Sequence, residues 1–158
     1  MKRRPAAHGS ASTTLLDDPT LRFLQVIWRL ENALERVSKR MEDSLGISGP
    51  QRFALRLIGE LPGVGAGKLA AALHLHPSTV TGVLQRLEAR GLIARTSHAT
   101  DARRRHLHLT RAGRRMLSPA IRGTVEHAVR TTLASCSGAN TRAAVDVIER
   151  FSCELLNE

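Results

Sequence analysis

The sequence predicts a mostly α-helical protein with one short β-hairpin. Helix-favouring Ala, Leu, Arg and Glu are abundant. Aromatic residues make up only 3% of the 158 residues and Tyr is absent, which argues against a large β-sandwich or barrel. Apolar residues recur at spacings of three and four over most of the chain, as they do in amphipathic helices. Two short alternating runs near the middle account for the hairpin.

Two helices are predicted at the start of the chain. Residues 1–16 are small, polar and basic without periodicity, so we expect a disordered basic tail. Asp18 caps a helix that ends near Leu45–Gly46, and a second helix starts at Ser48 and stops at residues 61–63. Their expected buried stripes are Leu24, Ile27, Leu30, Leu34, Val37 and Met41 in the first helix, and Phe53, Leu57, Ile58 and Leu61 in the second.

The central part predicts two helices joined by a tight turn and followed by the hairpin. A short helix over residues 67–73 precedes a longer one over residues 77–90, which Gly91 ends. Strands over residues 92–96 and 104–109 flank a polar segment. Two helices around a tight turn, followed by a hairpin, are the elements of a winged helix-turn-helix.

Two further helices are predicted at the end of the chain. Thr110 caps a helix that runs to about Ser135, and Asn140 or Thr141 opens the last one. Their apolar faces are Leu117, Ile121, Val125 and Ala128 in the first of these helices, and Ala144, Val147, Ile148, Phe151 and Leu155 in the second.

The outer helices carry more apolar surface than the central module can cover, and such a surface needs a partner. We therefore expect residues 17–46 and 111–158 to form a helical dimerisation region around a winged helix-turn-helix DNA-binding domain at residues 47–110. The alternative is that these helices pack only within one chain.

The charge pattern points to an anionic partner. The net charge is +10, and between Gly82 and Arg115 nine arginines stand against Glu88 and Asp101. From Thr124 onward, five acidic residues exceed three arginines. A localised basic patch predicts attraction to phosphate backbones or to anionic membrane surfaces. The alternating hairpin pattern does not match the continuous amphipathic helix that membrane-surface binding requires, so we expect double-stranded DNA.

One face of the helix over residues 77–90 has the chemistry of a recognition surface. A major groove about 12 Å wide admits a helix, in which Gln suits an adenine edge and Arg a guanine edge. Hydroxyl residues at the helix N-terminus allow close approach to phosphates. The expected DNA-contacting residues of this face are Ser78, Thr79, Thr81, Gln85 and Arg86, with Val80, Val83, Leu84 and Leu87 turned inward. The plainer interpretation is a solvated amphipathic helix.

The hairpin supplies a second set of candidate DNA contacts. Arg95, Arg103 and Arg104 flank its tip, where phosphates or a narrow minor groove would lie. The plainer interpretation of these arginines is a charged turn. Their position directly after the predicted recognition helix favours a role in DNA binding.

Several motifs resemble the MarR (multiple antibiotic resistance regulator) family. They are Leu69–Leu73 (LAAAL), His76–Thr81 (HPSTVT), Leu87–Ile93 (LEARGLI), Asp101–Arg103 (DAR) and Leu109–Gly113 (LTRAG). The resemblance implies a winged-helix homodimer that represses promoters and releases DNA when a small phenolic or aromatic acid binds. It also implies that Asp101 orients a wing arginine through an ion pair. Gly82 and Ala102 depart from the family, which often has Arg at both positions.

The resemblance also implies an effector pocket beside the recognition module. Trp28, Phe53 and Arg56 are its candidate lining residues, with Arg56 taking a ligand carboxylate. The alternative is that Trp28 and Phe53 are ordinary core residues.

Other chemistry has weaker support. His74/His76 and His106/His108 are spaced for metal binding but lack further ligands nearby, so no metal or other cofactor is expected. We expect Cys136 and Cys153 to be ordinary buried cysteines, which are the commoner case. A redox switch formed by these two thiols is the alternative. No catalytic motif is evident, and the glycine-rich residues 63–68 lack the spacing of a phosphate-binding loop.

We therefore predict a sequence-specific transcription regulator and not an enzyme. The expected form is a homodimeric repressor that leaves a pseudo-palindromic operator when a small ligand binds. The alternative is an architectural DNA-binding protein without an effector. No apolar run reaches the roughly 20 residues that span a bilayer, and the two cysteines are too few for a disulfide scaffold, so the cytoplasm, at the nucleoid, is the expected location.

Overall fold

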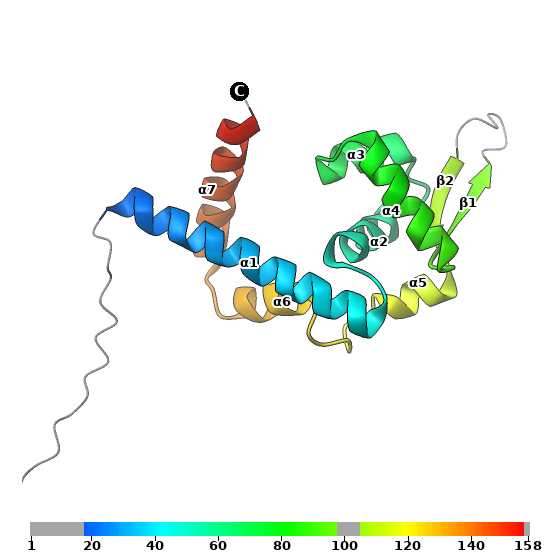
Figure 1. Cartoon of the computed structure of the whole chain (residues 1–158), viewed down its shortest axis with the longest axis horizontal. Coiled ribbons are helices and arrows are strands. Elements are labelled where there is room, and N and C mark those ends of the chain that lie inside the picture. Colours follow the sequence, from blue (N-terminus) through cyan, green and yellow to red (C-terminus); the bar gives the residue numbers. More distant parts are fainter. Residues whose placement is uncertain (1–17, 98–104, 157–158) are drawn as a thin grey trace, which may run out of the picture. The chain divides into compact units, whose positions relative to one another are not determined.

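The protein is mostly helical, with one two-stranded antiparallel sheet. The computed structural model describes residues 18–97 and 105–156, so the predicted N-terminal tail lies outside it. The chain divides into two compact units, Met1–Ala33 and Leu34–Glu158. The elements are α1 Pro19–Leu45, α2 Gly49–Glu60, α3 Ala66–Leu73, α4 Pro77–Ala89, β1 Ile93–Ser97, β2 Arg105–Leu109, α5 Arg111–Met116, α6 Val125–Ala134 and α7 Gly138–Leu156 (Figure 1).

The first two helices begin at the predicted caps. The backbone N–H of Thr20 donates to Asp18 Oδ1 over 2.8 Å. Ser48 and Gln51 form a reciprocal capping box, in which each side chain accepts from the other residue's backbone N–H. These bonds satisfy donors that have no partner within the helix, and so they fix where each helix starts.

The core of the second unit lies where α2, α3 and α4 meet the hairpin, and Figure 1 shows these elements together. Its members with at most 1% exposure include Ile47, Leu55, Ile58, Leu69, Val80, Leu84, Leu87 and Leu107. The predicted stripe of α2 is partly wrong: Phe53 is 50% exposed and Leu61 is 45% exposed. α3, α4 and β2 pack instead against the face of α2 that contains Ala54, Leu55 and Ile58.

The hairpin is present as predicted: β1 and the start of β2 lie one residue later than predicted, and β2 ends at the predicted Leu109. β1 and β2 pair antiparallel from Ile93 opposite Leu109 to Ser97 opposite Arg105. Leu107 also exchanges backbone hydrogen bonds with the α2–α3 connection, donating to Val64 O and accepting from Gly63 N–H. The base of the hairpin is therefore fixed to the core by main-chain bonds as well as by side-chain packing.

The predicted long helix after Thr110 is wrong in its extent. Thr110 caps α5 by accepting from the N–H of Gly113, but α5 ends at Met116 and α6 starts only at Val125. Pro119 lies in the gap, and it lacks a backbone N–H and clashes with the preceding turn of a helix. Gly123 has a φ of +74°, in the left-handed region. Leu117 and Ile121 therefore lie on the connection between two helices.

The last helix begins earlier than predicted. The Asn140 N–H donates to Ser137 Oγ over 3.1 Å, so Ser137 is the capping residue and α7 starts at Gly138. Neither α6 nor α7 has a buried residue, and Val147 and Ile148 are 51% and 45% exposed. In α1 only Met41 is buried. The apolar faces of the outer helices thus stay exposed or half-buried, apart from Met41, over the part of the chain that the structure describes.

Candidate nucleic-acid interface and ligand cavity

The turn between α3 and α4 fixes the direction of α4. His74 adopts a left-handed backbone with φ 51°, and the N–H of Leu75 donates to Ala70 O, which closes α3. His76 then caps α4, because its Nδ1 accepts from the N–H of Ser78, and Pro77 occupies the first turn. The connection is tight because each of its residues ends one helix or begins the next.

α4 has two distinct faces, as the sequence predicts. Val80, Val83, Leu84 and Leu87 are buried in the core. The five residues predicted to contact DNA are all exposed on the opposite side: Ser78, Thr79, Thr81, Gln85 and Arg86. The Thr81 hydroxyl donates to Pro77 O over 2.9 Å, so it presents its methyl group and an acceptor oxygen. α4 is therefore held by its apolar face, while its polar face is open to a partner.

Gly82 lies among these polar residues, and a methyl group there would meet nothing within 4 Å. At Gly113, by contrast, an added Cβ would overlap the carbonyl oxygen of Leu92. We expect Gly82→Ala to stabilise the fold by about 0.5–1 kcal/mol, because Gly is a poor helix former. Gly113→Ala should destabilise it by about 1–3 kcal/mol, because the core has no room for the methyl group.

Urea unfolding of the two glycine variants beside the parent chain measures both effects. A loss of stability in Gly82→Ala would contradict the open position of Gly82. An unchanged midpoint in Gly113→Ala would contradict the close packing of α5 against the residue that precedes β1.

The described part of the wing is tied to α4. Arg95 Nε lies 3.0 Å from Glu88 Oε2, and the Arg95 side chain is 24% exposed. This ion pair holds β1 against the end of α4, so the predicted DNA contact by Arg95 would have to share that guanidinium with Glu88. Asp101, Arg103 and Arg104 lie outside the described residues, and their predicted roles stay predictions.

The side chains of His76, His106 and His108 take part in local hydrogen bonds. A ring nitrogen of His106 is bonded to Gly63 O, and His108 Nε2 lies 3.1 Å from Thr96 Oγ1. Within residues 18–97 and 105–156, no three His, Cys, Asp or Glu side chains gather where they could share a metal ion. Cys136 and Cys153 are free thiols and both are exposed. The expectation of ordinary buried cysteines is therefore wrong for this chain, because Cys153 is on α7, which has no buried residue, and Cys136 is exposed on the connection that precedes α7.

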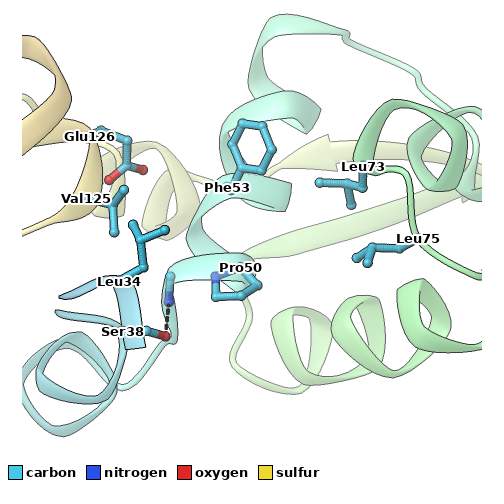
Figure 2. Close-up of a pocket in the computed structure, with 9 residues that line it drawn as sticks. Leu34, Ser38, Pro50, Phe53, Leu73, Leu75, Val125 and Glu126 are labelled. Carbon is cyan, nitrogen blue, oxygen red and sulfur yellow. Dashed lines mark hydrogen bonds between the residues drawn. The ribbon is translucent and has the colours of Figure 1, made fainter. Parts of the chain in front are cut away.

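A cavity of about 350 Å³ lies beside the helix-turn-helix. This volume is within the range of small-molecule pockets, roughly 300–1,000 Å³. Figure 2 shows Phe53 between Val125 and Leu34 on one side and Leu73 and Leu75 on the other. The polar side chains on its wall are Ser38, whose Oγ accepts from the N–H of Gly49 over 2.9 Å, and Glu126.

A buried arginine adjoins this cavity. Arg52 on α2 is 3% exposed, and its Nε donates to Glu126 Oε2 over 3.0 Å. Its Nη1 donates to the carbonyl of Met116 at the end of α5. Arg52 therefore joins α2, α5 and α6 through one guanidinium. Sequence analysis missed this residue, because its partner Glu126 is 74 positions away and no local pattern marks the pair.

Of the three predicted ligand residues, Phe53 alone is on the cavity wall. Arg56 forms an ion pair with Glu60 over 2.9 Å on the surface of α2, and it is not among the lining residues. Trp28 belongs to the first unit and is 61% exposed. The alternative that Trp28 and Phe53 are core residues is wrong, since both are at least half exposed.

Comparison with solved structures shows the fold. The helix-turn-helix and hairpin are those of a winged helix-turn-helix, and FabT of Streptococcus pneumoniae, crystallised with DNA, matches with a TM-score of 0.68 at 23% identity. That match covers 89% of this chain and 99% of FabT. A structure of Rv2887 from Mycobacterium tuberculosis in complex with salicylic acid matches with a TM-score of 0.55 at 26% identity, over 85% of this chain and 98% of that one.

Comparison with protein families finds a match for the central module. Residues 47–104 match the model of the MarR family. The transcriptional regulator HosA of Escherichia coli is 36% identical over 75 residues, which are 48% of this chain and 56% of HosA. The chain thus spans about half the length of this relative. The transcriptional repressor Rv2887 is 28% identical over 106 residues, covering 67% of this chain and 75% of Rv2887. No helix in the described part of the chain has the length and apolar character needed to cross a membrane.

Proposed function

We propose that this protein is a sequence-specific regulator of transcription that binds double-stranded DNA through the exposed face of α4. The observation that carries the proposal is the contrast between the two faces of this helix. Four buried aliphatic residues fix α4 to the core, while the side chains of Gln85 and Arg86 are exposed and make no hydrogen bond or ion pair with other described residues. Both side chains are able to bond base edges in a major groove.

In this proposal, the protein binds DNA as a homodimer. The supporting observation is the exposed apolar surface of the outer helices, including Leu24 and Leu30 on α1 and Val147, Ile148 and Leu155 on α7, each at least 37% exposed. Surfaces of this kind commonly mark interaction sites. A two-fold dimer would present two copies of α4 to half-sites about one DNA turn apart, which predicts a pseudo-palindromic operator.

The proposal includes repression that a small molecule relieves, in the cytoplasm where the chromosome lies. The cavity at Phe53 is the site for such a molecule, because it adjoins both the helix-turn-helix and α6. The resemblance to Rv2887, a repressor that has been crystallised with salicylic acid, supports both repression and an aromatic ligand. The second candidate, an architectural DNA-binding protein, shares the same interface but would release no DNA when the cavity is filled.

The test of α4 compares two arginine variants. A high-affinity duplex is first selected from random sequence with the unaltered protein, and its affinity is then compared with that of a scrambled duplex. Arg86→Ala should reduce the preference for the selected duplex by about 1–3 kcal/mol. Arg56→Ala removes the same charge from the exposed face of α2 and should leave the preference unchanged. Arg104→Ala, in the segment that the sequence predicts to flank the hairpin tip, should weaken binding to both duplexes alike.

Equal losses on both duplexes with Arg86→Ala would contradict the assignment of α4 as the recognition helix. A cavity ligand that binds without releasing DNA would favour the architectural alternative.

A further inference from the structure

The cavity at Phe53 has an unusual electrostatic character for a site that takes an aromatic acid. None of the nine described residues on its wall is cationic, and its one charged side chain is the carboxylate of Glu126. The arginine predicted to take a ligand carboxylate, Arg56, is engaged with Glu60 outside the wall. A ligand carboxylate placed here would be buried without a counter-charge, which is costly.

Only one of the two carboxylate oxygens of Glu126 has a hydrogen-bond partner among the described residues. Its Oε2 accepts from Arg52 Nε, but its Oε1 is buried and has no hydrogen-bond partner among the described residues. Arg52 cannot serve as the anion site, because it is 3% exposed and its guanidinium already bonds Glu126 and the carbonyl of Met116. Beside the Ser38 hydroxyl, the polar group on the wall is therefore a carboxylate, which only accepts hydrogen bonds (Figure 2).

We propose that the cavity binds an apolar, aromatic molecule that carries a single ammonium group, and that it discriminates against aromatic carboxylates. The ring contacts Phe53, Leu75 and Val125, and the ammonium donates to the Glu126 carboxylate. A charge-assisted hydrogen bond of this kind is stronger than a neutral one. The inference rests on the proposed function only in calling this molecule the effector, because binding is measured without DNA.

Isothermal titration of the unaltered protein with three probes of one shape tests the charge preference. The probes are naphthylmethylamine, which is protonated at neutral pH, naphthylmethanol and naphthoate, all attached at the same ring position. We expect the amine to bind roughly 10-fold more tightly than the alcohol. Naphthoate should bind more weakly than either.

Two variants locate the bond. Glu126→Gln should reduce amine affinity roughly 10-fold while changing alcohol affinity little, since the amide keeps the shape and loses the charge. Glu60→Gln removes a carboxylate outside the cavity and should change neither affinity. If Glu126→Gln does not fold, Phe53→Ala at a half-exposed position is the second variant, and it should lower the affinity for all three probes alike. The order of the three affinities on the unaltered protein then tests the charge preference.

Naphthoate binding as tightly as the amine, or the absence of binding by all three probes, would overturn the inference. DNA release is measured separately on the selected duplex. If the amine binds but the duplex stays bound, the chemistry of the cavity stands and the effector role fails. If the protein ignores duplex DNA altogether, the proposed function fails and the order of the three probes still decides the inference.

Discussion

Replacing Arg52 with Met is expected to lower the free energy of unfolding by about 3 kcal/mol. Removing one partner of a buried ion pair typically costs roughly 3–5 kcal/mol, because the other charge is left without compensation. The lower end applies here, since the Glu126 side chain keeps 27% exposure and can regain some hydration. The variant also leaves the carbonyl of Met116 without this donor. Urea unfolding at constant pH measures the loss.

Arg56→Met is the matched control for this prediction. It lies one turn further along the same helix and pairs with Glu60, but the two side chains are 47% and 60% exposed. Exposed pairs four residues apart contribute about 0.3–0.5 kcal/mol, so this variant should unfold almost as the parent does. Equal stability of the two variants would show that Arg52 does not hold α2 to α5 and α6.

The affinity for duplex DNA is expected to fall steeply with salt. Each phosphate that a cationic side chain neutralises releases condensed counterions, so log Kobs falls linearly with log salt. For a dimer making about 6–10 phosphate contacts, affinity should drop roughly 10³–10⁵-fold between about 50 and 200 mM salt. The nine arginines between Gly82 and Arg115 supply the charge for such contacts. Fluorescence anisotropy with a labelled duplex over a salt series gives the slope.

Thermal unfolding over the same salt series is the control, and it should show the fold intact throughout. A slope near zero would mean that the basic patch contacts few phosphates. That result would remove the electrostatic part of the account even if some sequence preference remained.

The central module was predictable from the sequence because local chemistry marks its boundaries. Ser48 and Pro77 begin helices, Gly91 follows the end of α4, and Thr110 caps α5. The buried and exposed faces of α4 followed from spacing alone. Pro119 and Gly123 also mark the break between α5 and α6 locally, but the apolar spacing continues across it and predicts one helix.

Features that depend on distant contacts were not predictable. α2 has apolar residues on two adjacent faces of the helix. Only the packing of α3, α4 and β2 decides that Leu55 faces the core while Phe53 faces the cavity. The bond from Arg52 to Glu126 depends on how α6 returns to α2, which no local pattern encodes. The residues that line the cavity were accordingly predicted less well than the buried and exposed faces of α4.

The central claim is that α4 enters a groove of duplex DNA, and placing a DNA-cleaving group on that helix tests it most directly. In a background of Cys136→Ser and Cys153→Ser, a thiol-linked iron–EDTA group is attached at Gln85→Cys, or at Ser152→Cys on α7 for comparison. Strand cleavage is expected from the α4 position at two sites about one helical turn apart, and none is expected from α7. Equal cleavage from both positions, or none from α4 on a duplex that the protein binds, would contradict the central claim.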